Sequence, residues 1–265
     1  MPIDLKLEGK VAIVSGGTRG LGAASARLLA ADGARLVLTD RDLGDLETFA
    51  EELRAAHQTE TALVPCDLTH ATAADGVAAR AEDAFGRIDI LINCAGASQG
   101  GVFWDIPDQV WQDSFALKFM GTIRMMRAVL PAMRRQKYGR IVTVVGDTGK
   151  QPRPRLLPGA AANAALLAVT KGLADEVAPD GISVNAVNPG PTRTERITTL
   201  FANLAASTGR PLADIEADFT EDSPFGTLGE PEDVARMIVL LASDAAKNIT
   251  GSSITTDGGR SRALA

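Results

Sequence analysis

The sequence predicts a doubly wound α/β fold, in which parallel strands alternate with helices. Two observations support this prediction. Short apolar runs rich in β-branched residues alternate with helical patterns along the whole chain. A glycine-rich stretch follows the first apolar run and precedes the first helical pattern. We therefore expect about seven parallel strands flanked by helices, in a single domain over residues 1–265.

The expected strands are short and mostly lack polar alternation, which is typical of strands covered on both faces. They span residues 10–15, 34–39, 61–66, 88–92, 139–145, 181–187 and 252–256. Helices are expected near residues 20–32, 43–57, 70–85, 109–136, 158–178 and 230–243. Residues 191–228 depart from the alternation, because they form a long insertion between the sixth strand and the last helix. An insertion at this place predicts a lid or a substrate wall.

The composition excludes several classes of protein. The chain is 45% hydrophobic and 23% charged with a net charge of −6, so we expect a folded globule that binds no nucleic acid. No uncharged run reaches the roughly 18 residues of a membrane span. The first ten residues lack the apolar core of a signal peptide, and the two cysteines are too few for a disulfide framework. These features favour a cytoplasmic protein that does not enter membranes.

The glycine-rich stretch has the spacing G-x-x-x-G-x-G, which predicts a dinucleotide-binding Rossmann loop. Gly16 permits a tight turn, Gly20 lets the backbone approach a pyrophosphate, and Gly22 allows the helix to pack closely on the strand. The alternative is an ordinary glycine-rich turn, but its place between a strand and a helix favours the nucleotide site. The cofactor-binding residues expected here are Ser15, Gly16, Thr18, Arg19, Gly20, Leu21 and Gly22.

The end of the second strand indicates which dinucleotide is bound. Asp40 lies 18 residues after Gly22, where a carboxylate accepts hydrogen bonds from ribose hydroxyls and repels a 2′-phosphate. This arrangement favours NAD over NADP. Arg19 and Arg41 point the other way, because guanidinium groups suit a 2′-phosphate. We expect NAD as the cofactor, with NADP the weaker ligand.

Five motifs in order along the chain resemble those of the short-chain dehydrogenase/reductase family, single-domain branch. The motifs are Ser15-Gly16 to Gly22, Cys66-Asp67-Leu68, Asn93-Cys94-Ala95-Gly96, Asn188-Pro189-Gly190 with Thr192 and Thr194, and Ile249-Thr250-Gly251 with Asp257-Gly258-Gly259. The resemblance implies an NAD(P)-dependent oxidoreductase acting on a carbonyl or alcohol. It also implies that Asp67 contacts the adenine and that the segment from Pro189 to Thr194 holds the nicotinamide carboxamide.

The family's catalytic residues do not appear at the positions that the resemblance assigns. The family uses Tyr-x-x-x-Lys after the fifth strand, a serine 13 residues before that tyrosine, and an asparagine on the preceding long helix. The corresponding residues of this chain are Gly159, Asn163, Gly146 and Lys118. The one tyrosine, Tyr138, precedes the fifth strand and is followed four residues later by valine, so we expect it in a surface loop. The sequence thus predicts a divergent member with a non-standard site.

Two residues are candidates to replace the missing acid. Lys118 would project toward the nicotinamide from a mostly apolar helix, where loss of water can bring its pKa toward neutrality. The alternative is that it extends to solvent. Asp147 is the weaker candidate, because a polar residue after a strand is commonly part of a turn. Neither the two cysteines nor the two histidines have the spacing of metal ligands, so no metal is expected.

The sequence is compatible with three functions. The first is an oxidoreductase with an atypical proton donor, which the complete nicotinamide-side motif favours. The second is a non-catalytic sensor or subunit that binds NAD, and the third is a non-redox enzyme that uses NAD as a scaffold. Lys150, Arg153 and Arg155 border the expected substrate mouth and suggest an anionic small-molecule substrate, with a solvated basic loop as the alternative. Pairing of the two long helices would give a homodimer or homotetramer.

Overall fold

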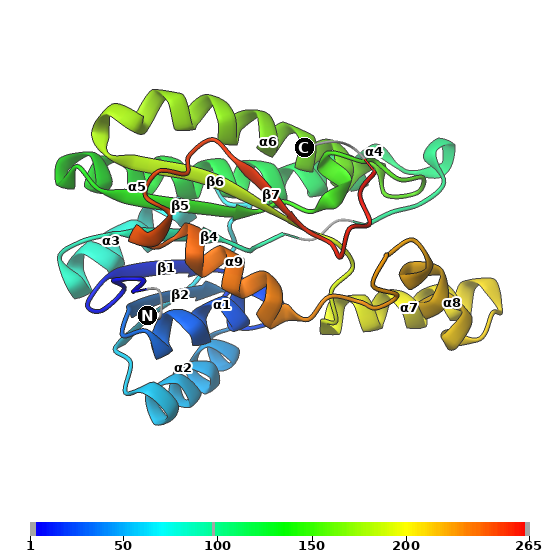
Figure 1. The fold of residues 1–265 in the computed structure, drawn as a ribbon, viewed down its shortest axis with the longest axis horizontal. Coiled ribbons are helices and arrows are strands. Elements are labelled where there is room, and N and C mark those ends of the chain that lie inside the picture. The colour runs from blue at the N-terminus through cyan, green and yellow to red at the C-terminus, as the bar shows by residue number, and fades with distance from the viewer. Residues whose placement is uncertain (1–3, 97–98, 263–265) are drawn as a thin grey trace.

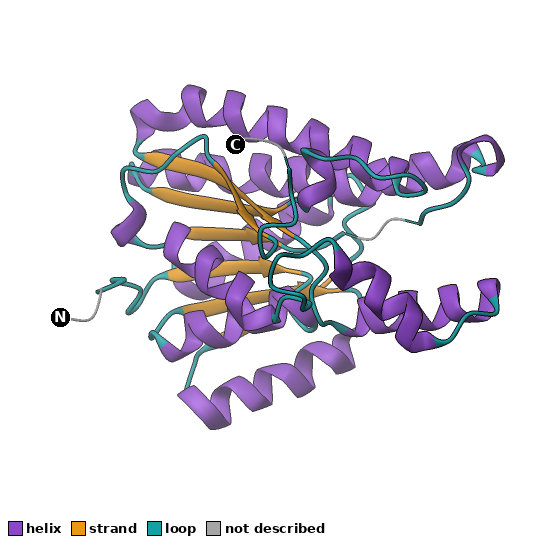
Figure 2. Ribbon diagram, turned by 45° about the vertical axis from the view of Figure 1, so that its right-hand side comes forward, coloured by secondary structure: helices purple, strands orange, loops and turns teal. Residues whose placement is uncertain are grey.

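The computed structural model describes residues 4–96 and 99–262. Its strands form one parallel sheet in the order β3-β2-β1-β4-β5-β6-β7, with helices on both faces (Figures 1 and 2). The strands are β1 Val11–Ser15, β2 Arg35–Asp40, β3 Thr61–Pro65, β4 Ile90–Asn93, β5 Gly139–Val144, β6 Ile182–Pro189 and β7 Ser253–Thr256. The expected seven-stranded, doubly wound α/β fold is confirmed. The chain reverses its direction of winding between β1 and β4, and ligands of such sheets bind beside that reversal.

Each face of the sheet is covered by its own group of helices, and each group contributes a separate apolar core. The first group comprises α1 Gly20–Ala31, α2 Leu43–His57 and α9 Pro231–Leu241. The second comprises α3 Ala73–Phe85, α5 Thr122–Gln136 and α6 Leu157–Val177. Central strands contribute to both cores because successive side chains point to opposite faces. Within the described residues, no helix is long and apolar enough to cross a membrane.

Local sequence signals account for several helix boundaries. The Asp42 carboxylate accepts a hydrogen bond from the amide of Asp45 and caps the start of α2, which ends at Gln58 in the left-handed conformation. Helix α9 starts with Pro231, and the acidic Glu232 and Asp233 occupy its first turn, where the helix dipole favours negative charge. These boundaries agree with those expected from the sequence.

The long helix expected over residues 109–136 is divided in the structure. Helix α4 covers Asp108–Ser114, a wider π-helical segment covers Phe115–Gly121, and α5 continues from Thr122. Such wide turns inside helices are uncommon and often lie at functional sites. Lys118 lies within the π-helical segment, so the helix is irregular where the sequence places a candidate catalytic residue.

Residues 191–228 form a small helical unit that projects from the carboxyl edge of the sheet (Figure 1). It consists of α7 Glu195–Thr208 and α8 Leu212–Glu221. Phe201, Ile215 and Leu228 form its apolar centre, and the Phe201 and Phe219 rings lie 4.9 Å apart. Because this unit has its own small core, its two helices support one another at a distance from the sheet. We call residues 191–228 the lid, and its role over a substrate remains a prediction.

A fully buried carboxylate joins the start of β1 to the start of β4. One Asp89 carboxylate oxygen accepts a hydrogen bond from the Val11 amide at 2.9 Å. The Arg87 guanidinium donates to both oxygens of the same carboxylate, at 2.7 and 2.6 Å. Removing one partner from such a buried, hydrogen-bonded group is costly, because the remaining partners stay buried without an acceptor.

Replacing Asp89 with alanine should lower the free energy of unfolding by about 2–4 kcal/mol, because the Val11 amide loses its partner and a cavity remains. Urea unfolding followed by circular dichroism measures this change. Asp83→Ala on the exposed face of α3 is the matched control and should change stability by less than about 0.5 kcal/mol. Equal unfolding midpoints for the two variants would contradict the assignment.

Candidate functional site

Two positions of the glycine-rich loop between β1 and α1, Gly16 and Gly22, have backbone contacts too close for a side chain. A Cβ added at Gly22 would lie 1.9 Å from the carbonyl oxygen of Gly16. Gly16 has a φ of +64°, and a Cβ there would lie 2.9 Å from the amide nitrogen of Ala95. Helix α1 starts at Gly20 without a side-chain cap, so its first amide groups are available to an anion. The loop therefore fits the pyrophosphate of a dinucleotide.

Two other loops approach the glycine-rich loop at the same edge of the sheet. The Ala95 amide, after β4, donates a hydrogen bond to the Ser15 hydroxyl at 3.3 Å. Thr194, after β6, packs against Gly20, whose added Cβ would lie 3.4 Å from the threonine methyl group. Thr192 is buried and donates to the Gly190 carbonyl at 2.9 Å, which shapes the turn between them. The structure thus brings three of the expected cofactor motifs together.

The other predicted nucleotide residues have mainly structural contacts among the described residues. Asp67 accepts a hydrogen bond from the Thr69 amide at 2.8 Å, and this bond lowers the pKa of its carboxyl. Leu68 is buried beneath Gly121. Asn93 is buried at the end of β4, and its amide donates weakly to the Thr143 hydroxyl at 3.4 Å. Leu21 packs against the first core, and Pro189 is buried at the end of β6.

Asp40 faces the glycine-rich loop and uses both carboxylate oxygens within the chain. One oxygen accepts a hydrogen bond from the Thr18 hydroxyl at 2.6 Å, and the other accepts one from the Arg41 amide at 2.8 Å. Arg19 and Arg41 are both exposed. This carboxylate therefore stabilises the loop, while two guanidinium groups are available at the surface.

Lys118 reaches the carboxyl edge of the sheet. Its ammonium donates a hydrogen bond to the Val145 carbonyl, just after β5, at 2.8 Å. Its carbon stem lies across Gly96, where an added Cβ would be 3.2 Å from the lysine Cγ. The side chain therefore lies between the loops that follow β4 and β5 and does not extend to solvent. An ammonium has three N–H groups, and the hydrogen bond to Val145 engages one of them.

The surroundings of Lys118 favour its neutral form. Burial lowers the pKa of Lys118 to about 7, and the charge of Arg196 acts in the same direction. The Asp147 carboxylate opposes both effects. Arg196, in the first turn of α7, donates to the Gly96 carbonyl at 3.4 Å. Lys118 can therefore exchange a proton near neutral pH.

Gly146, Gly159 and Asn163, which the sequence aligned with catalytic positions, carry no acid or base. Gly146 has a φ of +113°, and an added Cβ there would lie 3.0 Å from the side-chain nitrogen of Asn163. Asn163 is buried and donates to the Thr148 hydroxyl at 2.8 Å. Gly159 lies in the first turn of α6. Asn163 thus contacts the loop after β5, and its amide does not supply the positive charge of a lysine.

Asp147 and the basic loop after it are directed toward the lid and the C-terminal segment. Asp147 is buried, which raises the pKa of its carboxyl, while Arg153 and Arg260 oppose that rise. Arg153 forms an ion pair with Asp222 of the lid at 3.1 Å. Lys150 donates to the Ser253 carbonyl at 2.9 Å, and Arg155 is exposed. The three expected cations therefore do not converge, and only Arg153 joins a charged cluster.

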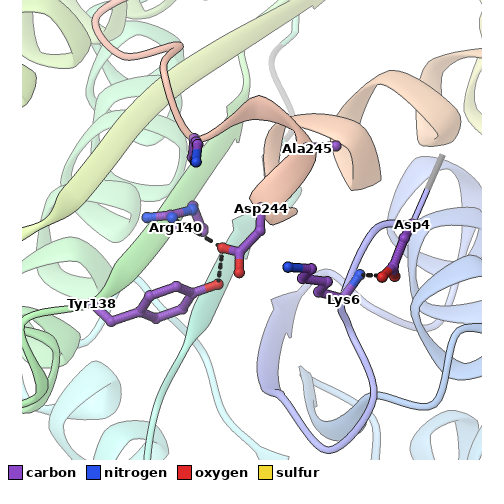
Figure 3. Close-up of a pocket in the computed structure, with 7 residues that line it drawn as sticks. Asp4, Lys6, Tyr138, Arg140, Asp244 and Ala245 are labelled. Atoms are coloured by element: carbon purple, nitrogen blue, oxygen red, sulfur yellow. Dashed lines mark hydrogen bonds and ion pairs between the residues drawn. The ribbon is translucent and has the colours of Figure 1, made fainter.

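Tyr138 directly precedes β5, at the amino edge of the sheet, and is half-buried. Its side chain points toward Asp244 (Figure 3). Its hydroxyl donates to Asp244 at 3.0 Å, and the Lys10 ammonium lies 3.9 Å from its ring centre. It borders a pocket of about 340 Å³ lined by Asp4, Lys6, Tyr138, Arg140, Asp244, Ala245 and Lys247. This separation excludes Tyr138 from the chemistry at the carboxyl edge. The expectation of a simple surface loop missed the Arg140 and Asp244 contacts.

Four residues near the candidate site were not predicted from the sequence. Arg196 and Asp222 belong to the lid, Thr148 contacts Asn163, and Arg260 lies in the C-terminal segment. Arg260 is only 5% exposed, although it follows two consecutive glycines in a stretch that resembles a polar turn. For Arg196, Thr148 and Arg260 the one sequence signal was a polar or charged residue close to a motif, and Asp222, inside the insertion, had no such signal.

Comparisons with known proteins agree with this geometry. The family model described as enoyl-(acyl carrier protein) reductase matches residues 16–261. The short-chain reductase protein NovJ of Streptomyces niveus is 33% identical over 252 residues, covering 94% of this chain and 93% of that protein. A crystal structure of L-sorbose reductase from Gluconobacter frateurii with NADPH and L-sorbose has a TM-score of 0.94 at 29% identity, covering 99% of this chain and 100% of that chain. YwfH, an NADPH-dependent reductase involved in bacilysin biosynthesis, has a TM-score of 0.91 at 27% identity, covering 96% and 99%.

The expectation of NAD as the preferred cofactor is wrong. It is overturned by the two similar solved structures, since one contains NADPH and the other is an NADPH-dependent reductase. The physical reason lies in two guanidinium groups that oppose the effect of Asp40. Its oxygens each already accept one hydrogen bond within the protein, from Thr18 and from the Arg41 amide, while the Arg19 and Arg41 side chains are exposed and suit a 2′-phosphate.

Lys118→Met should stabilise the folded protein at pH 6, by about 1–3 kcal/mol, because a desolvated charge is removed. The unfolded chain keeps this proton up to about pH 10.4, whereas the folded chain releases it near pH 7. The wild type therefore gains stability relative to the variant as pH rises from 7 to 10. Denaturant unfolding of both proteins from pH 6 to 10 measures the difference. A difference that does not vary with pH would contradict the lowered pKa.

Proposed function

The chain belongs to the short-chain dehydrogenase/reductase family of oxidoreductases, and on that premise we propose that it is an NADP(H)-dependent reductase of small carbonyl compounds with Lys118 as proton donor. The observation that carries the proposal is the position of the Lys118 ammonium. It lies at the carboxyl edge of the sheet, between Gly96 and Val145, where the parallel strands also end beside the glycine-rich loop. In this proposal, that juxtaposition would give an acid of near-neutral pKa beside the dinucleotide.

The residues of the nucleotide site fit NADP(H). The glycine-rich loop has space for backbone contact with a pyrophosphate, and the uncapped start of α1 has free amide groups. The exposed Arg19 and Arg41 would hold a 2′-phosphate, because guanidinium groups bind phosphate oxygens in pairs. When bound, the nicotinamide supplies the hydride.

Lys118 would supply the proton. Reduction of a carbonyl leaves negative charge on oxygen, and the protonated ammonium can donate a proton to that oxygen. Its hydrogen bond to the Val145 carbonyl keeps the ammonium in place while other N–H groups face the reacting oxygen. The Asp147 carboxylate supports the charged form, and the positive charge of Arg196 disfavours it. These opposing effects allow the same lysine to lose and regain the proton during turnover.

NADPH should bind at least about tenfold more tightly than NADH to the wild type, and Arg41→Ala or Arg19→Ala should weaken NADPH binding about 10- to 100-fold. The reason is loss of a charge-assisted contact to the 2′-phosphate, so NADH affinity should change less than about twofold. Isothermal titration calorimetry measures both affinities. Arg54→Ala, on the exposed side of α2, is the control. Equal binding of NADH and NADPH to the wild type would refute this assignment.

Lys118→Met should lower kcat/KM for carbonyl reduction roughly 10²–10⁴-fold while NADPH affinity stays the same. In the wild type, reduction should slow as pH rises above about 7, because the donor must be protonated. Initial rates of NADPH oxidation with a ketone and aldehyde panel provide the measurement. The control is Lys171→Met, which removes an exposed ion pair with Asp175 on α6. Unchanged turnover in Lys118→Met would remove this lysine from the mechanism.

A further inference from the structure

Two arginines from distant parts of the chain meet at the base of the lid. Arg153 follows β5, and Arg260 lies in the C-terminal segment after β7. Both approach the carboxylate of Asp222 at the end of α8, at 3.1 Å from Arg153 and 3.8 Å from Arg260. The Arg260 guanidinium carbon also lies 5.8 Å from the ring centre of Phe219, so the lid holds this side chain in position.

This pair of guanidinium groups is not fully satisfied. Arg260 is 5% exposed, and within the described residues neither its Nε nor that of Arg153 has a hydrogen-bond partner. Asp222, their shared partner, is 57% exposed at its side chain. Asp257 lies nearby, but its oxygens accept from the amides of Gly259 and Ser261. Buried donors without acceptors are costly, so the cluster has capacity for a further anion.

The charges in the cluster also connect it to the proposed reaction centre. Asp147 acts electrostatically on Lys118 on one side and on Arg153 and Arg260 on the other. It directly follows Gly146 at the end of β5. Asp147 is therefore close enough to act electrostatically on both Lys118 and the two arginines.

We propose that Arg153 and Arg260 form a subsite for a carboxylate of the substrate, which makes the substrate class an oxo acid. This inference rests on the proposed carbonyl reductase function. The Asp222 carboxylate already contacts both guanidinium groups, so the position accepts a planar carboxylate. Being mostly exposed, Asp222 can turn to solvent when the substrate carboxylate takes its place. The oxo group of the acid is then directed to Lys118.

The kinetic test compares 2-, 3- and 4-oxopentanoate with their methyl esters, which have the same carbon skeletons and no charge. Wild-type kcat/KM should favour at least one acid over its ester by about tenfold or more. Arg153→Gln and Arg260→Gln should each reduce kcat/KM for that acid about 10- to 100-fold and change the value for the ester less than about threefold. Arg260→Lys should recover part of the loss. Arg236→Gln, which removes an exposed contact on α9, is the control.

The opposite variant separates an anion subsite from a purely structural ion pair. Asp222→Asn removes the carboxylate that competes for both arginines, so acids should bind more tightly, by about threefold or more. If the cluster served only to hold the lid, this variant would weaken acid and ester binding alike. Isothermal titration of the same acids into the NADPH-free and NADP⁺-bound proteins measures binding without turnover.

The outcomes distinguish this inference from the proposed function. Reduction of the esters with no preference for any acid would overturn the oxo acid assignment while the reductase function stands. Acid binding that is lost in Arg153→Gln and Arg260→Gln, without any turnover, would support the subsite and refute the reductase function. If the wild type binds no acid and Asp222→Asn has no effect, the subsite is overturned whatever the catalytic result.

Discussion

The packing of Gly22 directly against the Gly16 carbonyl is the contact on which the rest of the site depends. A Cβ at position 22 would lie 1.9 Å from that oxygen, so only glycine allows α1 to start where it does. The same turn lets the backbone after β4 come within 2.9 Å of the Cβ position of Gly16. Because the sheet is parallel, the ends of β1, β4, β5 and β6 lie at this one edge. The nucleotide loop, Lys118 and the lid all meet there.

The positive charge of a lysine in an apolar helix must be offset by hydrogen bonds or by opposite charges. The charge of Lys118 is offset only in part. The Val145 carbonyl receives one of its hydrogen bonds and Asp147 provides an opposite charge, but loss of water and Arg196 outweigh them. These effects bring the pKa of Lys118 to about 7, a value that favours proton transfer at neutral pH. Lys118 lies in the π-helical segment, and wide turns of this kind often lie at functional sites.

Local patterns predicted the fold well. The expected seven strands and the helices around the glycine-rich loop appear within a few residues of their predicted bounds, because apolar periodicity and glycine spacing act over short distances. Features that depend on contacts between residues far apart in the sequence were harder to predict. The π-helical interruption around Lys118 had no local signal, and neither did the meeting of Arg153 with Arg260. The sequence predicted that Asp40 binds the ribose of NAD. It could not show that the Asp40 oxygens accept hydrogen bonds from the Thr18 hydroxyl and the Arg41 amide, because these contacts form only in the folded chain.

The lid is attached to the body at both ends, and this limits how it can move. Thr194, near its start, packs against Gly20 of the glycine-rich loop, and Asp222, just after α8, contacts Arg153 and Arg260. The two ends of the lid also lie side by side, because the Arg193 amide donates to the Gly229 carbonyl and the Gly229 amide donates to the Pro191 carbonyl. Displacing the lid from the sheet would therefore break the contacts of Asp222 before those of this paired stem. A ligand that touched Gly20 and Thr194 and a ligand that engaged the two arginines would therefore both contact the same two-helix unit.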